Sequence, residues 1–251
     1  MRETTAVEQL ARVPQLTAVF WLVKVLSTGV GETSSDFLVK SFDPVVVVVL
    51  CAVVFAACFV IQLRAGRYVP WRYWLLVTMV AIFGTMVADV THIVLDVPYS
   101  VSTPAFALAV AAVLFTWWRV EGTLSVHSVT TPRRELFYWA TVLATFALGT
   151  ALGDLTATTL RLGYLGSGIM FAGLIALPGI AYRLGLGATA AFWWAYILTR
   201  PLGASFADWI AVTRDRGGLD LGTLVISAIG VGAIAASVIG MQLHARERAR
   251  V

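Results

Sequence analysis

Five acidic and two basic residues stand inside the apolar stretches of this 251-residue chain, where a charge is costly to bury. Carboxylate oxygens suit hard cations such as Mg²⁺ and Mn²⁺, and they also accept protons. The five negative charges outweigh the two positive ones, which favours a cation as ligand. We therefore expect the acids to be metal ligands or proton acceptors and the bases to be their counter-ions. The acids are Glu32, Asp36, Asp89, Asp154 and Asp208, and the bases are Lys24 and Arg200.

A polar stripe runs along one helix face of the first apolar stretch, and a similar stripe surrounds Arg200 in the seventh. Together the two stripes predict a wetted path through the interior of a helical bundle. His92 follows Asp89 by three residues, near the same end of this path, and a lone histidine is more often structural than a ligand. The first stripe consists of Lys24, Ser27, Thr28, Gly31, Glu32 and Ser35.

The two cysteines do not extend this chemistry. Cys51 and Cys58 lie in an uncharged apolar run, so we interpret them as buried small hydrophobes. The sequence has no cluster of cysteine or histidine, which argues against copper or zinc as ligand. It also has no nucleophile–base set and no cofactor motif, so we expect neither an enzyme nor a bound cofactor.

The charged residues belong to a pattern that occurs four times. Each copy has a tryptophan, a glycine ten residues later and an aspartate fifteen residues later, with a small residue just before the aspartate. Such self-similarity indicates tandem repeats, which we place at approximately 14–66, 67–125, 132–186 and 187–245 within one membrane domain, 1–251. The tryptophans are Trp21, Trp74, Trp139 and Trp193, and the glycines are Gly31, Gly84, Gly149 and Gly203.

Each repeated residue type has two interpretations. A glycine four residues before another small residue lets helices approach closely in lipid, and it also allows a hinge at mid-membrane. Tryptophan is typical of membrane interfaces, and it can also pack or gate at a cytoplasmic mouth. The aspartates either converge around the repeat axis as an ion site or cap and pair helices near the outer interface.

With these repeats and tryptophans the chain resembles a family of bacterial membrane proteins of unknown function. Members of that family are built from four tandem repeats, each with two transmembrane helices and a signature tryptophan. The resemblance runs from about Leu16 to about Leu243. It implies an all-α polytopic membrane protein with eight transmembrane helices, and it implies no particular activity.

Composition also places the chain in a membrane. Hydrophobic residues make up 59% and charged residues 13%, against roughly 45–50% and about 25% in ordinary soluble domains. Spanning a bilayer takes about 20 apolar residues. Stretches of this kind lie at roughly 15–39, 44–63, 72–95, 101–118, 136–160, 162–182, 189–212 and 221–243.

Lysine and arginine are unevenly distributed between the two sets of connecting segments. Twelve fall in the termini and the segments expected beside them, and four fall in the other segments. By the positive-inside rule we expect both termini to be cytoplasmic, and we recognise no cleavable signal peptide. The resemblance to bacterial membrane proteins implies the bacterial inner membrane. The four motif helices then run in parallel as an inner bundle, with the other four as an outer scaffold. Short basic loops of this kind do not indicate a nucleic-acid partner.

These features predict a membrane transporter or channel for a small cation, with a divalent metal such as manganese favoured and proton coupling beside it. The expected partners are thus the lipid bilayer and a cation or proton. One rival is a transporter of an anionic or organic substrate held by Lys24 and Arg200. The other is a scaffold or sensor that transports nothing, in which the acids only pair helices. In the cation interpretation, Glu32 pairs with Arg200 or with Lys24 until a cation competes for it.

Overall fold

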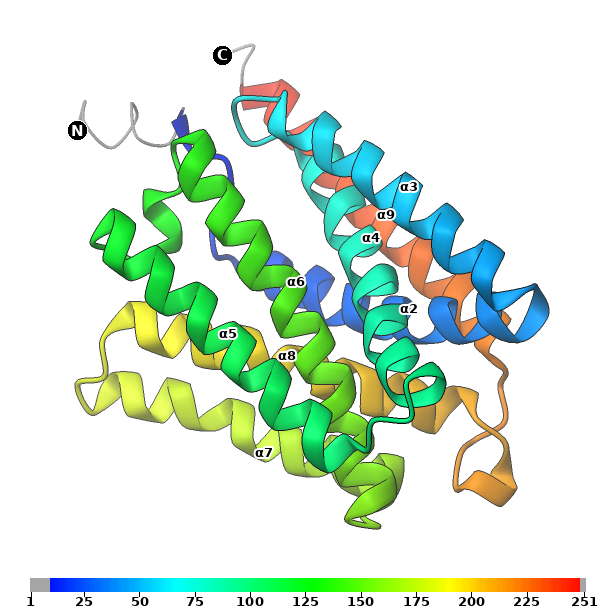
Figure 1. Ribbon diagram of the computed structural model, residues 1–251. Coiled ribbons are helices and arrows are strands. Elements are labelled where there is room, and N and C mark those ends of the chain that lie inside the picture. Colours follow the sequence, from blue (N-terminus) through cyan, green and yellow to red (C-terminus); the bar gives the residue numbers. More distant parts are fainter. Residues whose placement is uncertain (1–9, 249–251) are drawn as a thin grey trace.

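The computed structural model describes residues 10–248, in which every regular element is helical (Figure 1). Two of the long helices, α4 and α6, each continue as a π-helix, η1 (Val90–Val94) and η3 (Leu155–Thr159). Two short 3₁₀-helices, η2 (Val126–Ser128) and η4 (Arg214–Arg216), lie in connections. The long helices are α2 (Ala18–Ser41), α3 (Pro44–Leu63), α4 (Pro70–Asp89), α5 (Tyr99–Glu121), α6 (Pro132–Asp154), α7 (Gly163–Arg183), α8 (Ala188–Ala211) and α9 (Thr223–Arg248).

Local sequence signals explain where several of these helices begin and end. The Asp43 carboxylate accepts the Val46 amide in front of α3, and the Thr131 hydroxyl accepts the Arg134 amide in front of α6. Proline opens α3, α4 and α6, where its missing N–H has no partner to lose. Helix α5 ends at Gly122, whose φ of 69° is a left-handed conformation that favours glycine.

The helices run back and forth between two ends of the bundle (Figure 1). We call the end that holds Leu10, the start of α2 and the close of α9 the termini end, and the opposite one the far end. The connections α3–α4, α5–α6 and α7–α8 lie at the termini end, and the other four lie at the far end. Helices α2, α4, α6 and α8 therefore all run from the termini end to the far end.

These four helices form a closed inner ring. Helix α2 packs on α4, α4 on α6, α6 on α8, and α8 packs back on α2. Each outer helix packs mainly on the inner helix of the next repeat: α3 on α4, α5 on α6, α7 on α8, and α9 on α2. The fourth repeat thus closes onto the first, and the arrangement agrees with the expected inner bundle of motif helices.

Six of the described helical stretches are long and apolar enough to cross a membrane, which makes an integral membrane protein plausible. Helices α2 and α8 have 24 residues each but carry the buried charges, so the prediction that they also span is not established by their composition. The six stretches are Pro44–Leu63, Pro70–Val94, Tyr99–Glu121, Pro132–Thr159, Gly163–Arg183 and Thr223–Ala245.

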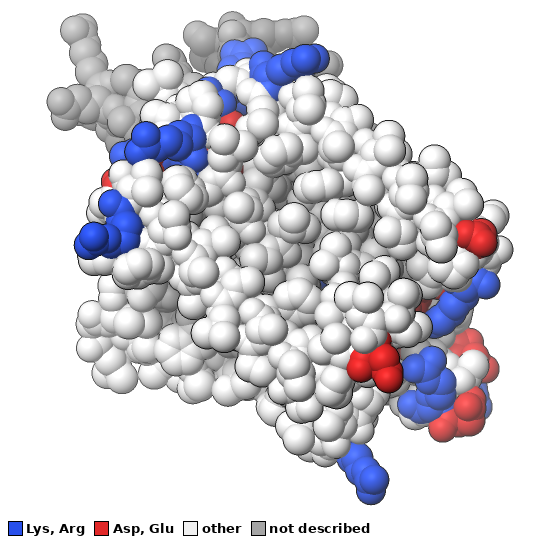
Figure 2. Space-filling model, in the orientation of Figure 1, with Lys and Arg blue, Asp and Glu red and all other residues white. Residues whose placement is uncertain are grey.

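Charges gather at the two ends and leave the flank between them apolar. Figure 2 shows basic side chains at the termini end and a mixture of both signs at the far end. The chain order places these groups accordingly. The termini end carries Arg64, Arg67, Arg72, Arg119, Arg133, Arg134 and Arg183, whereas the far end carries Lys40, Asp43, Asp96, Arg161, Arg214, Asp215, Arg216 and Asp220.

Candidate functional site

The interior of the inner ring is built from residues that recur every four positions on each of its helices. A four-residue step rises about 6 Å, and rows of this spacing are the ridges that interdigitate between packed helices. All of these residues are buried except three partly exposed aspartates, Asp36, Asp89 and Asp154. The rows are Phe20, Lys24, Thr28, Glu32 and Asp36 in α2; Tyr73, Val77, Ala81, Thr85 and Asp89 in α4; Tyr138, Val142, Phe146, Thr150 and Asp154 in α6; and Phe192, Tyr196, Arg200, Ala204 and Asp208 in α8.

Arg200 lies at the centre of the ring and contacts all three other inner helices. Its Nη2 donates to Glu32 Oε2 at 2.6 Å and to the hydroxyl of Thr150 at 2.7 Å. The same nitrogen reaches the hydroxyl of Thr85, and Nη1 donates to the carbonyl of Thr28 at 3.1 Å. The Arg200 and Glu32 side chains are only 1% and 6% exposed, so the predicted pairing is confirmed as a buried ion pair. We call it the central pair.

Lys24 lies one layer nearer the termini end and is fully buried without a hydrogen-bond partner for Nζ among the described residues. Its Nζ stands 4.1 Å from the centroid of the Phe146 ring and 4.3 Å from that of Tyr196. The Arg200 guanidinium carbon lies 5.4 Å from the same Phe146 ring. Lys24 is therefore held by aromatic faces rather than by Glu32.

Eight aromatic residues close the ring at the termini end, and we call them the collar. In each repeat the residue before the tryptophan contacts the tryptophan of the next repeat. Centroid distances are 5.7 Å for Phe20–Trp74, 5.3 Å for Tyr73–Trp139, 6.2 Å for Tyr138–Trp193 and 5.8 Å for Phe192–Trp21.

The collar decides between the two interpretations of the tryptophans. Trp74, Trp139 and Trp193 are at most 4% exposed, and only Trp21 is partly exposed. Interfacial anchoring is therefore wrong for those three, because the ring packs them inside. Packing at one mouth of the bundle is the arrangement observed, since aromatic faces and edges from all four repeats meet there.

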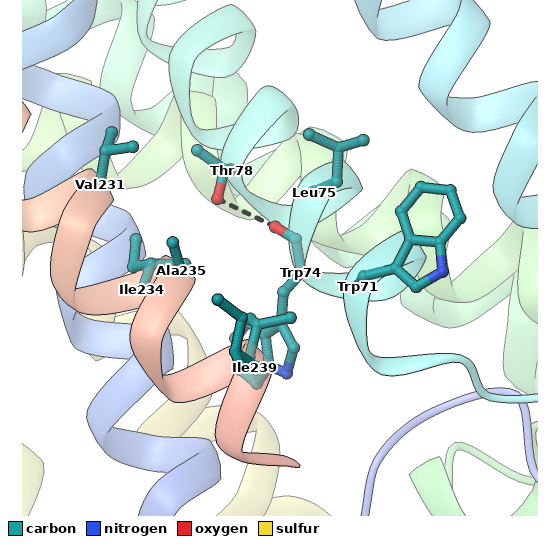
Figure 3. Close-up of a pocket in the computed structure, with 9 residues that line it drawn as sticks. Trp71, Trp74, Leu75, Thr78, Val231, Ile234, Ala235 and Ile239 are labelled. Atoms are coloured by element: carbon teal, nitrogen blue, oxygen red, sulfur yellow. Dashed lines mark hydrogen bonds between the residues drawn. The ribbon is translucent and has the colours of Figure 1, made fainter. Parts of the chain in front are cut away.

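Two apolar grooves reach the collar from outside. One, of about 280 Å³, lies between α4 and α9, and Figure 3 shows Trp74 pointing from α4 toward α9 in it. The hydroxyl of Thr78 donates to the Trp74 carbonyl at 2.9 Å. A second groove, of about 670 Å³, borders Trp21 and Phe192 between α2, α7 and α8. Such apolar walls suit lipid chains.

The four motif glycines lie where neighbouring inner helices approach most closely. A Cβ on Gly31 would clash with Ala81, one on Gly84 with Phe146, one on Gly149 with Arg200, and one on Gly203 with Thr28. Each glycine thus faces the residue seven positions after the tryptophan of the next repeat. Both helix packing and a hinge were open from the sequence, and regular α-helix through all four positions favours packing.

The motif aspartates share the far end of the ring, and we call them the far-end acids. Asp89 and Asp208 each interact electrostatically with Glu32, Asp36 and Asp154. Asp36 also pairs with Lys40 at 2.5 Å on its own helix. Among residues 10–248, however, no three His, Cys, Asp or Glu side chains are grouped closely enough to hold a metal ion. Their role as metal ligands stays a prediction.

Local distortion follows two of the four acids and none of the motif glycines. The π-helices η1 and η3 begin directly after Asp89 and Asp154, and π-helical turns are frequent at functional sites. His92 lies in η1, stacks on Tyr99 at 3.7 Å and has its Nδ1 2.9 Å from the Val97 carbonyl. These contacts hold the turn that follows and agree with the structural interpretation of this histidine.

A second buried ion pair, beneath the collar, escaped the sequence analysis. Arg12 Nη1 donates to Glu135 Oε2 at 2.6 Å, and Gln62 Nε2 donates to Glu135 Oε1 at 2.8 Å. The backbone N–H of Arg12 donates to the Val129 carbonyl at 3.0 Å, which ties the segment before α2 across the termini end. Glu135 stands four residues before Trp139, and this closeness to the motif was the available signal.

The aromatic residues before the tryptophans were also missed. Phe20, Tyr73, Tyr138 and Phe192 form a column that an alignment of the four copies contains as plainly as the tryptophans. Two of them, Tyr73 and Tyr138, join their hydroxyls at 2.5 Å inside the ring. Such a recurring aromatic position in the alignment was the sequence signal for the collar.

Comparison with known proteins gives a family without an assigned activity. The family model described as Repeat of Unknown Function (DUF347) matches residues 19–68, 72–123, 137–184 and 191–246. No curated protein and no solved structure matched the chain. Because the four matched segments cover most of its length, the chain belongs to the family of four-repeat proteins defined by this repeat.

Proposed function

We propose that the protein is a transporter or channel for a small cation in the bacterial inner membrane, with both termini in the cytoplasm. The observation that carries this proposal is the central pair. Glu32 is a buried carboxylate at the point where all four repeats meet, and within residues 10–248 it forms an ion pair with Arg200 of the fourth repeat. A cation that reaches Glu32 competes with Arg200 for the same oxygens.

The far-end acids supply the approach to this point. Asp89, Asp154 and Asp208 lie one layer nearer the far end than Glu32 does. Within the part of the chain that the structure describes, Asp36 pairs with Lys40, whereas the other three acids form no ion pair. Grouped carboxylates raise the local concentration of cations at a mouth. In this proposal the acids gather cations at the outer side, and the central pair admits them singly.

The collar and the Arg12–Glu135 pair close the cation path toward the termini end. Both lie between the central pair and the cytoplasmic side in the proposed orientation. The basic termini end supports that orientation, because positive charge is retained on the cytoplasmic side (Figure 2). A cation then passes when the central pair opens first and the collar opens afterwards.

A divalent metal such as Mn²⁺ remains the favoured inorganic cation, since carboxylate and hydroxyl oxygens line this region. Metal binding requires the far-end acids to move together from their present spacing. Proton coupling is built into the same site, because crowded carboxylates retain protons that an arriving cation displaces.

The test is a flux panel with purified protein in liposomes. Mn²⁺, Mg²⁺, K⁺ and protons are offered from either side, and uptake is compared with that of protein-free liposomes. We expect uptake of at least one cation well above that baseline. Baseline uptake of every cation would overturn the proposal and favour a scaffold or sensor.

A second candidate function is transport of an anionic substrate, and the lone amino group of Lys24 is the observation that favours it. In that case Lys24 and Arg200 would hold the substrate together. Uptake of small organic anions in the same liposomes, abolished by Lys24→Met, would support this candidate over cation transport.

A further inference from the structure

The environment of Lys24 is unusual for a buried basic side chain. Its Nζ lies over the faces of Phe146 and Tyr196, 4.1 Å and 4.3 Å from the two centroids, and makes no hydrogen bond within the described residues. The Tyr196 hydroxyl is likewise buried without a partner there. The basic residue beside the Phe146 ring is Arg200, whose guanidinium carbon lies 5.4 Å from the ring centroid.

Aromatic faces around an amino group are a known recognition site in proteins. The negative face of an aromatic ring attracts an ammonium ion, and such cages bind alkylated ammonium ligands. A carboxylate completes an amine site by pairing with the charge. Here the cage of Phe146 and Tyr196 and the carboxylate of Glu32 lie in different layers, because Glu32 stands eight residues, about 12 Å, further along α2 than Lys24. An ammonium ion would therefore meet the carboxylate and the cage in succession.

Both parts are occupied by basic side chains of the protein itself. Lys24 fills the cage, and Arg200 holds Glu32 at 2.6 Å while flanking the same Phe146 ring. A ligand that replaced these contacts would have to be a cation with an apolar body. We propose that the Lys24 side chain occupies the site at which the substrate binds, and that the substrate is a small alkylammonium ion. This inference rests on the proposed cation transport and names its substrate class.

Other substrate classes fit the cage less well. Aromatic faces repel an anion, because the same quadrupole that attracts an ammonium ion opposes negative charge. A divalent metal needs several oxygen ligands, which the ring faces of Phe146 and Tyr196 do not supply. A small alkylammonium ion uses the cage for its apolar body and charge, and it enters past the far-end acids.

The space released by Lys24 sets the size of the substrate. The cage encloses the end of a four-carbon amine, and the walls around it are fully buried. Primary ammonium ions from methylammonium to butylammonium match this end, and bulky quaternary ions exceed it.

The decisive experiment removes the Lys24 amino group from the cage. In detergent, Lys24→Ala should bind methylammonium and propylammonium at least tenfold more tightly than the native protein, as measured by calorimetry. Lys24→Met, which keeps the length and apolar body of the side chain, should gain affinity in the same direction and serves if the alanine variant does not fold. Propanol, a neutral analogue of similar size, should show no such gain. Adding Phe146→Leu to Lys24→Ala should abolish the gain, because one cage wall is lost.

A matched flux measurement separates this inference from the proposed function. Methylammonium should enter liposomes that contain the native protein and compete with any other transported cation. Flux of Mn²⁺ or protons that methylammonium does not affect, with no gain of affinity in the Lys24 variants, would overturn the inference and leave cation transport standing. Absence of all cation flux would overturn the transport proposal, while a tenfold gain in Lys24→Ala would still establish the ammonium cage.

Discussion

At the scale of the residue, the molecule is centred on one guanidinium. Arg200 donates to groups on α2, α4 and α6, so a single side chain of α8 ties the whole ring together. Planar guanidinium suits this task, because its several N–H groups point in fixed directions. A lysine in the same place would offer a point charge and fewer fixed contacts.

Removing the Arg200 guanidinium should therefore destabilise the folded protein. Arg200→Met leaves the Glu32 carboxylate buried without its partner, and the free energy of unfolding should fall by about 3–5 kcal/mol. Glu32→Gln in the same background should restore much of that loss, since the uncompensated charge is gone. Denaturant unfolding in detergent of the two single variants and the double variant measures the coupling. Strictly additive effects would contradict a shared buried pair.

Residue chemistry was partly predictable from the sequence. Glu32 and Arg200 could be matched because the repeat alignment places them within one layer of each other on neighbouring helices. The place of Glu135 beside the motif was visible in the sequence. Its pairing with Arg12 could not be predicted, because it depends on how the segment before α2 crosses the termini end. Because each aspartate follows its tryptophan by the same number of residues, the four lie at the same position along the bundle axis. This spacing does not fix the distances between them across the ring, and hence no metal site could be derived.

At the scale of the element, close approach of the inner helices depends on the motif glycines. Gly31 faces the backbone of Ala81, which cannot move aside as a flexible side chain can. Gly84 and Gly149 face mainly side chains of the next helix, and Gly203 faces the Thr28 side chain and the Val25 carbonyl. Close packing of this kind is the main source of helix association in lipid.

Gly31→Ala should separate α2 from α4 and lower the free energy of unfolding by about 1–3 kcal/mol. Gly173→Ala on outer helix α7 is the matched control, because a Cβ there meets open space. The control should be neutral or slightly stabilising, since alanine favours helix over glycine. Thermal unfolding of both variants in one detergent provides the comparison, and equal effects would argue against tight packing at Gly31.

The limits of prediction at this scale concern α2 and α8. Their length agrees with the predicted spans, but their charges lower their apolar character below that of the other six. Helices that carry a polar interior must be covered by apolar neighbours to lie in a membrane. In the described structure α9 and α7 provide much of that cover, by packing on α2 and α8.

At the scale of the whole molecule, the four repeats form a ring that closes on itself. Contacts in the collar, at the glycines and between the outer and inner helices all follow the same order from one repeat to the next. Parallel repeats around an axis were predictable from the chain. The packing of each outer helix on the inner helix of the following repeat was not predictable. The order of the hairpins alone does not say which inner helix an outer helix covers.

Ring closure can be tested by a crosslink between the first and last repeats. The Ser227 hydroxyl of α9 donates to the Thr33 hydroxyl of α2 at 2.8 Å, so cysteines at both positions should form a disulfide on mild oxidation. Cys51 and Cys58 are first replaced by alanine. Cleavage in the α5–α6 connection should then leave the two halves joined under non-reducing electrophoresis.

Thr33→Cys with Ser102→Cys is the control pair for that crosslink. Both residues are buried, but Ser102 belongs to α5, which packs on α6 rather than on α2. The two halves of this control variant should separate after cleavage in the α5–α6 connection. Joined halves in the control, or separate halves in the test pair, would contradict the closed ring.

In the proposed function, transport through this ring depends above all on Glu32. The most direct measurement compares Mn²⁺, proton and methylammonium fluxes in liposomes for the native protein, Glu32→Gln and the exposed control Glu247→Gln. With Glu32→Gln, the transported cation loses the carboxylate for which it competes with Arg200, so its flux should fall at least tenfold. The Glu247→Gln flux should match that of the native protein. Equal flux through native and Glu32→Gln protein would contradict the account, because the central pair would then have no part in admitting a cation.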